Sequence, residues 1–330
     1  MCALAVLGKA QIKLGGGKGL VSFKHHIEKF QNRNKPNLKP GEIIQVRSEN
    51  EILATLDRTG ALEGLAFNEE MRKYCGRNFR ILKPVETIIV EGVAGRRHMK
   101  QTVILEGVMC DGEAHDKCCK TCPLLWKEAW LRRVETELEE ISPRIPMAEA
   151  DISYGLFEGS SNCQLINLLK ASSPIQRWDF RQYLWDIKSG TYGLVERFEM
   201  ILVSINSGFR KFLSRSPPPE VKPGTTPIAV LNLKPGELVE VKSEAEIRAT
   251  LDLRNKNRGL SFTSEMKKHC GKRFRVLKRL DRMYLEQTGT MRQIANTVLL
   301  DGGTCDGKAN LGCQRSCYCL YREIWLRRVK

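Results

Sequence analysis

The sequence contains no stretch of about 18 consecutive apolar residues, the length that a helix needs to cross a membrane. Residues 1–7 are apolar but too few for the hydrophobic segment of a signal peptide, and no basic segment precedes them. We therefore expect a cytoplasmic protein without a membrane span. Thiols stay reduced in that compartment, so clustered cysteines bind metal more often than they form disulfides.

The motifs of common catalytic sites are missing as well. The sequence has no G-x-S-x-G, H-E-x-x-H or dinucleotide-binding fingerprint. Residues 15–18 (GGGK) lack the spacing of a phosphate-binding loop and no Ser or Thr follows them. Histidine is scarce, with five in 330 residues. The sequence therefore gives no motif for these enzyme classes, and we expect binding rather than catalysis, with enzymatic activity left undecided.

The chain does contain an internal duplication. Residues 38–134, which we call copy one, align without a gap to residues 233–329 of copy two, at a constant spacing of 195 residues. The opening segment LKPGE and the closing segment LRRV occur in both. Residues that both copies keep are candidates for what one unit needs, whereas a residue found in one copy is not a ligand common to both.

Each copy shows the same local signals. Short strands are expected at 43–46 and 238–241, followed by Ser48 and Ser243, each with Glu three residues later, which predicts a capping box. A second short helix carries Phe67, Met71 and Tyr74 and should end at Cys75-Gly76. Further strands are expected at 79–82 and 102–105, joined as a hairpin with a turn near Gly95, or near Gly289 in copy two. A last helix is expected over 124–134.

These signals predict an α+β protein. It has two tandem small β-sheet domains, partly open and barrel-like, with short helices; each is stapled by a four-cysteine metal site, and a helical segment joins them. The predicted domains are a flexible basic arm (1–37), copy one (38–134), a helical link and proline-rich linker (135–232) and copy two (233–330). Apolar residues at helical spacing over 174–213 suggest the helical part of the link, and 214–227 the stiff linker.

Four cysteines keep their places in the two copies. They are Cys75, Cys110, Cys118 and Cys122 in copy one, and Cys270, Cys305, Cys313 and Cys317 in copy two. Thiolates are preferred ligands of zinc and of iron–sulfur clusters, so each quartet predicts one metal site. Structural Zn²⁺, two per chain, is the first interpretation; a [4Fe–4S] cluster is the alternative, and disulfides or unbound thiols also remain open.

Other potential ligands occur in one copy only. His115 aligns with Asn310, so a shared site does not need it, and we expect an exposed loop histidine. Cys119 and Cys319 have no cysteine counterpart, and Cys2 and Cys163 lie outside the repeats. Trp130 and Arg132–Arg133 recur as Trp325 and Arg327–Arg328, and we expect the tryptophans to lie in the core.

The net charge of +16 is unevenly distributed. It amounts to +6 for residues 1–37, +2 for 38–134, −2 for 135–232 and +10 for 233–330. A basic surface attracts polyanions, so an acidic protein or nucleic acid is a possible partner of residues 233–330. Copy one has the same cysteines without this charge, so polyanion binding is not the basic task of the module. The sequence gives no indication of oligomeric state.

Three segments carry a resemblance: YCGR-x-FR at 74–80, TVLLDG-x-x-CDG at 297–307 and REIWLRRV at 322–329. With this signature the chain resembles a family of bacterial hypothetical proteins, and the resemblance covers both copies. It implies no particular activity. We therefore expect a metal-binding tandem-repeat protein that acts as a binding or scaffold protein. The rival is an enzyme or electron-transfer protein of a biosynthetic pathway that uses an iron–sulfur cluster or a zinc thiolate.

Overall fold

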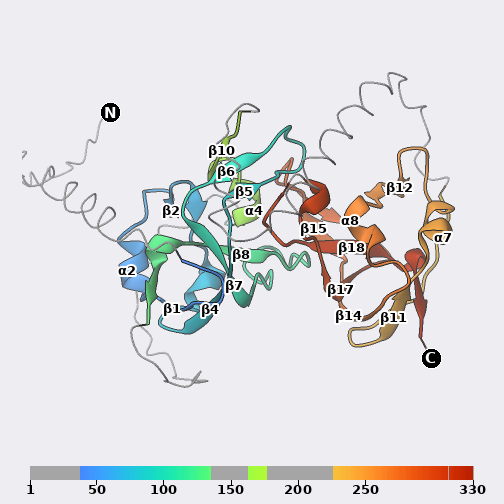
Figure 1. Ribbon diagram of the computed structural model, residues 1–330, viewed down its shortest axis with the longest axis horizontal. Coiled ribbons are helices and arrows are strands. Elements are labelled where there is room, and N and C mark those ends of the chain that lie inside the picture. Colours follow the sequence, from blue (N-terminus) through green and yellow to red (C-terminus); the bar gives the residue numbers. More distant parts are fainter. Residues whose placement is uncertain (1–37, 135–162, 177–225, 311, 330) are drawn as a thin grey trace, which may run out of the picture. The chain divides into compact units, whose positions relative to one another are not determined.

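Figure 1 shows the computed structural model of the chain, which describes residues 38–134, 163–176, 226–310 and 312–329. These residues belong to one compact unit. The predicted basic arm lies outside the described residues, and so does most of the predicted helical link and proline-rich linker. No helix among the described residues is long and apolar enough to cross a membrane.

Copy one forms a five-stranded antiparallel sheet in the order β8-β7-β4-β1-β9. Its strands are β1 (Ile43–Val46), β4 (Asn78–Pro84), β7 (Thr102–Met109), β8 (Pro123–Lys127) and β9 (Leu131–Arg133). The expected strands at 43–46, 79–82 and 102–105 are therefore confirmed. The register shifts once between β4 and β7 and once between β7 and β8, and such irregularities bend a sheet.

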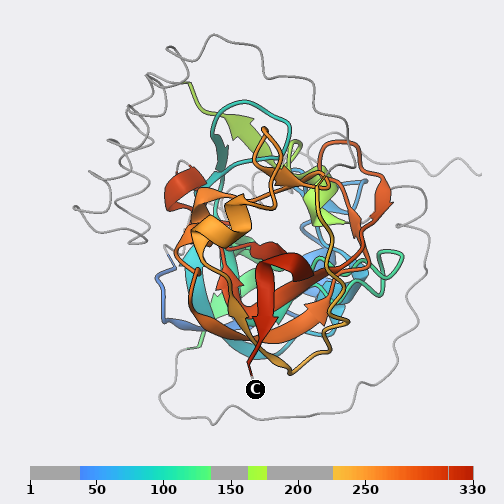
Figure 2. The ribbon, with the colours of Figure 1, turned by 90° about the vertical axis from the view of Figure 1, so that its right-hand side faces the viewer.

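Copy two forms an equivalent sheet in the order β18-β17-β14-β11-β19. Its strands are β11 (Leu238–Val241), β14 (Arg273–Arg279), β17 (Thr297–Thr304), β18 (Tyr318–Arg322) and β19 (Leu326–Arg328), each 195 residues after its counterpart. Figure 2 shows this sheet, in orange and red, curling around its core. The molecule is thus mostly β, with two curled half-barrel sheets and a few short helices, rather than an even mixture of helix and strand.

Capping boxes begin the first helix of each copy. In α2 (Glu49–Leu53) and α7 (Glu244–Arg248), the Ser48 and Ser243 hydroxyls accept from the N3 backbone, and the N3 glutamates accept in return. The next helices, α3 (Glu69–Arg72) and α8 (Ser264–Lys267), are a single turn long. Gly76 follows α3 with φ +72°, the left-handed conformation that the sequence predicted there.

Short hairpins fill the connections. They are β2 (Ala61–Leu62) with β3 (Leu65–Ala66), β12 (Lys256–Asn257) with β13 (Leu260–Ser261), β5 (Thr87–Ile88) with β6 (Arg97–Met99), and β15 (Arg282–Tyr284) with β16 (Met291–Gln293). Strands β4 and β7 pair antiparallel as expected, but the turns with Gly95 and Gly289 belong to these inner hairpins. From the link, α4 (Gln164–Asn167) contacts β3, and β10 (Ser172–Pro174) pairs with β6, so this part of the link packs on copy one.

The helix expected over 124–134 is wrong. The segment consists of β8, the 3-10 turn η1 (Glu128–Trp130) and β9, and copy two has the same order with η4 (Glu323–Trp325). Trp126 and Trp130 have helical spacing, yet the turn between the two strands also directs both rings into one core. Trp130 and Trp325 are fully buried, as predicted, and each indole N–H donates to a threonine hydroxyl.

Candidate metal centre

The cysteine loop of copy one begins where β7 ends. Gly112 has φ +85°, and a β-carbon there would collide with the carbonyl oxygen of Cys118, so only glycine permits this turn. The Cys118 N–H donates to His115 O at 2.9 Å, and the Cys110 N–H donates to Cys122 O at 2.8 Å. These bonds fold residues 110–122 back on themselves, so that three predicted ligands come from one closed loop.

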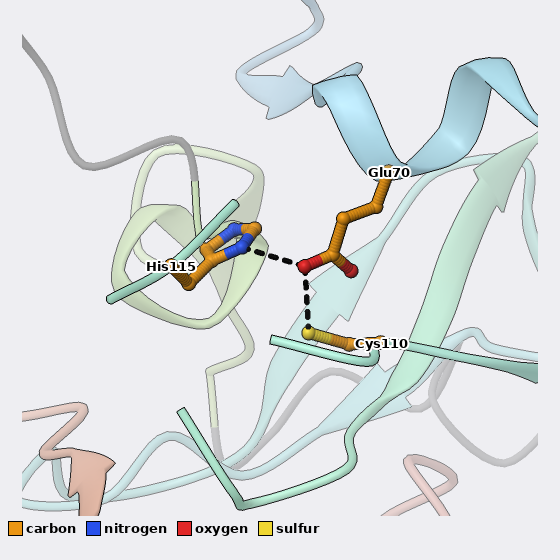
Figure 3. A group of neighbouring side chains, drawn as sticks. All are labelled: Glu70, Cys110 and His115. Carbon is orange, nitrogen blue, oxygen red and sulfur yellow. Dashed lines mark hydrogen bonds and ion pairs between the residues drawn. The ribbon is translucent and has the colours of Figure 1, made fainter. Parts of the chain in front are cut away.

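The first turn of α3 places a carboxylate against this loop. Glu70 Oε1 lies 2.8 Å from His115 Nδ1, accepts from the Gly112 N–H at 3.1 Å and lies 3.5 Å from Cys110 Sγ (Figure 3). Glu70, Cys110 and His115 are all buried, with ligand atoms within 4.8 Å of one another. Among the described residues this is the one group of three or more His, Cys, Asp or Glu side chains so closely spaced.

The burial of His115 corrects the expectation of an exposed loop histidine, because only 3% of the residue is accessible. This burial left no sign in the sequence because Asn310 stands at this position in copy two. The partner Glu70, by contrast, recurs as Glu265, which is also buried. The Glu70 carboxylate favours the imidazole tautomer with the proton on Nδ1, which leaves the lone pair on Nε2, the arrangement common among metal-ligating histidines.

A small pocket beside this group brings further thiols together. Its volume is about 30 Å³, and it is lined by Cys110, His115, Cys118, Cys122 and Cys163 of copy one and the link, with Arg315 and Cys317 of copy two among the other lining residues. A single water needs roughly 10–15 Å³, so the pocket suits one or two small ions rather than an organic cofactor. Cys163 carried no signal in the sequence because it lies outside the repeats.

Burial is the main influence on these thiols. It raises the pKa of Cys110 far above the usual value, and the charge of Glu70 adds to the rise. Burial also raises the pKa of Cys122, against the opposing charge of Lys120, and raises the pKa of Cys163 to about 11. Without metal these three groups are therefore neutral thiols at neutral pH. A bound cation favours the thiolate, so metal binding would release protons.

The structure does not bring Cys75 to the pocket. Burial raises its pKa to about 12; the charge of Glu49 adds to this rise and the charge of Arg72 opposes it. Its sulfur lies 4.0 Å from the carbonyl oxygen of Met71, one helical turn earlier. Cys270 in copy two has the same position, 4.0 Å from Met266 O. That Cys75 and Cys270 bind metal stays a prediction.

The loop of copy two has the same backbone closure but different side chains. The Cys305 N–H donates to Cys317 O at 2.8 Å, and the Asn310 side-chain amide donates to Cys305 Sγ at 3.4 Å. Cys313 Sγ accepts from the backbone N–H of Ile89 in copy one at 3.3 Å. Burial raises the pKa of Cys305 to about 11 and that of Cys319 to about 12, and Cys305 is the first neighbouring charge that acts on Cys319.

Both loops are tied to the preceding helix by a shared ion pair. Lys73 pairs with Asp111 in copy one, and Lys268 Nζ lies 2.7 Å from Asp306 in copy two. Asp111 and Asp306 thus position the loop through a lysine of the helix, which explains why Asp follows the first loop cysteine in both copies. The side chains of both ion pairs are partly exposed, so each pair contributes only modestly to stability.

Comparison with known proteins finds no matching family model, no matching curated protein and no matching solved structure.

Proposed function

We propose that this chain is a zinc-binding tandem-repeat protein, in which metal holds the cysteine loops folded and the whole acts as a binding or scaffold protein. One observation carries the proposal. His115, paired with the buried Glu70, lines a pocket together with Cys110, Cys118 and Cys122. Cysteine and histidine are the usual zinc ligands, and a histidine held by a carboxylate is a common second feature of such sites.

We propose a specific ligand set in copy one. Cys110, Cys118 and Cys122 would supply three thiolates and His115 Nε2 the fourth ligand, with Glu70 orienting the ring. Four protein ligands close the tetrahedral sphere of Zn²⁺ and leave no position for a substrate, which is the property of a structural site. The same set differs from the predicted quartet in one member, with His115 in the place of Cys75.

Copy two offers Cys305, Cys313 and Cys317 from the equivalent loop, so the proposal keeps two zinc ions per chain. Asn310 is a poor zinc ligand, so the fourth ligand there must come from another residue. Cys270 is the prediction from the repeat, and Cys319 is a second buried thiol whose charge interacts with Cys305 and Cys317. The two sites are therefore expected to differ in affinity.

The rival function is an enzyme or electron carrier with a [4Fe–4S] cluster or a reactive zinc thiolate. A cluster needs four ligands, which the cysteines lining the pocket could supply, but it is larger than the one or two small ions that a pocket of about 30 Å³ suits. A reactive zinc needs an open coordination position, which the proposed set does not leave. We therefore propose a closed zinc site rather than either alternative.

Copy two also carries the proposed partner surface. Lys272, Arg275 and Arg292 are exposed on its strands and turns. Several other arginines are paired with carboxylates, for example Arg327 with Glu246 at 2.7 Å and Arg328 with Glu237 at 2.8 Å. These pairs reduce the positive charge that the surface of copy two presents to a partner. We propose an acidic protein or a nucleic acid as partner. Its affinity should fall steeply with added salt, because counterions are released on binding.

Elemental analysis of the native protein, purified anaerobically, tests the metal proposal. We expect zinc, about two per chain, and no absorption near roughly 400 nm, where iron–sulfur clusters absorb. His115→Asn, which installs the copy-two residue, should lose the copy-one ion, whereas Cys75→Ser serves as the matched control and should keep it. A coloured protein containing iron would favour the rival, and a protein without metal would refute both.

A further inference from the structure

Two backbone hydrogen bonds between the copies recur with the roles of the two copies reversed. The Cys119 N–H donates to Arg282 O at 2.9 Å, and the Gln314 N–H donates to Thr87 O at 2.9 Å. Residues 119 and 314 are counterparts, and so are 87 and 282. A contact between i and j that recurs between j and i is the property of an isologous, two-fold interface. The copies therefore dock like the subunits of a symmetric dimer, through their cysteine loops.

At a two-fold axis, residues meet their own counterparts, and this interface shows such pairs. The Glu91 N–H donates to Glu286 Oε2 at 3.1 Å, and a β-carbon on Gly92 would collide with the side chain of Gln287. Both pairs are 195 residues apart. Lys120 and Arg315, also counterparts, bind one and the same carboxylate, Glu286, at 3.2 and 2.7 Å.

This carboxylate and its two cations are buried. The exposed fraction is 4% for the Glu286 side chain, 12% for Lys120 and 9% for Arg315. Burial alone would raise the pKa of Glu286, but Arg315 and then Lys120 lower it to about 2, so the carboxylate is ionised at neutral pH. Two cations and one anion leave a buried net charge of about +1, which is costly without a further counter-charge.

The excess positive charge faces the metal pocket. Lys120 and Arg315 both line it, together with Cys122 and its counterpart Cys317. Zn²⁺ bound by three cysteine thiolates and one neutral histidine would form a centre with a net charge of about −1. The metal centre would thus supply the counter-charge that the protein alone leaves missing.

We propose that the metal centre of copy one is a composite site, in which Arg315 of copy two, held by Glu286 and joined by Lys120, is a positioning residue that balances the charge of the zinc thiolates. This inference rests on the proposed function. It adds that copy one needs the docked copy two for full metal affinity, and that Arg315 acts through its charge and not as a ligand.

Three full-length variants test the role of Arg315. Arg315→Met removes the charge with similar bulk, Arg315→Lys installs the residue that copy one has at this position, and Arg327→Met removes an exposed arginine of the same copy. Zinc affinity is measured by competition with a chromophoric chelator, and circular dichroism checks that each variant is folded. We expect Arg315→Met to lower the affinity of the copy-one site, identified as the site that His115→Asn abolishes, about tenfold to a hundredfold, the effect of losing an outer partner of metal ligands.

Arg315→Lys should restore most of the affinity, and Arg327→Met should match the wild type. Arg315→Lys keeps the charge but loses the bidentate contact with Glu286. If both Arg315 variants lost metal equally, or if Arg315→Met bound zinc like the wild type, the composite site would be refuted while zinc binding stood. A wild-type protein that binds no zinc would instead refute the proposed function and this inference with it.

Discussion

Glu128 in copy one and Glu323 in copy two occupy the same place in the fold but have different neighbours. Glu323 is fully buried, and Arg279 Nη1 lies 2.7 Å from its carboxylate. Pro84 stands at the equivalent position of copy one and brings no charge. Burial, followed by the charge of Glu86, therefore raises the pKa of Glu128 to about 7. Both copies keep a carboxylate here, half-buried in copy one and fully buried in copy two, and only copy two has Arg279 to neutralise it.

The same contrast appears around the metal loops. Copy one has His115, oriented by Glu70, where copy two has Asn310; copy one has Lys120 where copy two has Arg315. The backbone closure of the loops is identical, with a 2.8 Å bond between the first and last loop cysteine in each. The copies thus share a backbone arrangement and differ in the charged side chains placed on it, so we expect them to differ in stability.

Replacing Arg279 should have the largest effect on this comparison. Arg279→Ala leaves Glu323 buried without its cation, which we expect to cost about 3–5 kcal/mol of unfolding free energy. Arg273, whose side chain is 64% exposed, is the control, and Arg273→Ala should cost less than about 0.5 kcal/mol. Urea unfolding measures both. Equal costs would show that the buried ion pair does not stabilise copy two.

Replacing Glu70 and its counterpart Glu265 sharpens the difference between the metal loops. Glu70→Gln removes the charge that orients His115 and should weaken zinc binding in copy one about tenfold or more, up to a hundredfold. Glu265→Gln should have a smaller effect, because Asn310 offers no imidazole to orient. Chelator competition resolves the two sites, and a larger loss from Glu265→Gln would reverse our assignment.

The pKa of Glu128 predicts a pH dependence specific to copy one. Its folded value of about 7 lies above the unfolded value near 4.5, so folding favours the protonated form. Its contribution to stability is fully present below about pH 4.5 and is lost as the pH rises through 7. Glu128→Gln should remove this loss. Its stability relative to the wild type should therefore be about 1–2 kcal/mol higher at pH 8 than at pH 4, after discounting for partial exposure.

Thermal unfolding of Glu128→Gln and Glu323→Gln across this pH range provides the check. The second substitution removes the partner of Arg279 and should destabilise at every pH above 5. If Glu128→Gln showed no advantage at pH 8, solvent would be reaching this carboxylate more freely than its burial indicates.

The capping boxes predict the smallest difference between the copies, because they are the same in both. Ser48→Ala and Ser243→Ala should each cost about 1 kcal/mol. Hydrogen exchange of α2 and α7 measures them separately. Costs that differed by more than the measurement error would mean that the surroundings of the helices, and not the caps, determine their stability.

Several elements followed directly from the sequence because their signals are local. The capping boxes, the left-handed Gly76 and the strands at 43–46 and 238–241 depend on residues a few positions apart, and the structure has all of them. The helix expected at 124–134 failed for a non-local reason. Its residues have helical spacing, but β8 and β9 are recruited as strands by pairing with β7 and β1.

The candidate site was predicted only in part. The loop cysteines Cys110, Cys118 and Cys122 line one pocket, which their close spacing favoured. The comparison of the two copies gave no sign of His115 or Cys163, because His115 aligns with an asparagine and Cys163 lies outside the repeats. A duplication reveals what both copies share and hides what one copy has acquired. The pairing of His115 with Glu70, 45 residues away, needs the fold to become visible.

X-ray absorption at the zinc edge, on the wild type and on His115→Asn, measures the ligand shell most directly. Our account predicts zinc with a sulfur-dominated shell at about 2.3 Å and a nitrogen contribution near 2.0–2.1 Å. His115→Asn should remove that nitrogen or the ion that it binds. A shell of sulfur alone in the wild type, unchanged in His115→Asn, would contradict the assignment of His115, and a protein free of zinc would contradict the account as a whole.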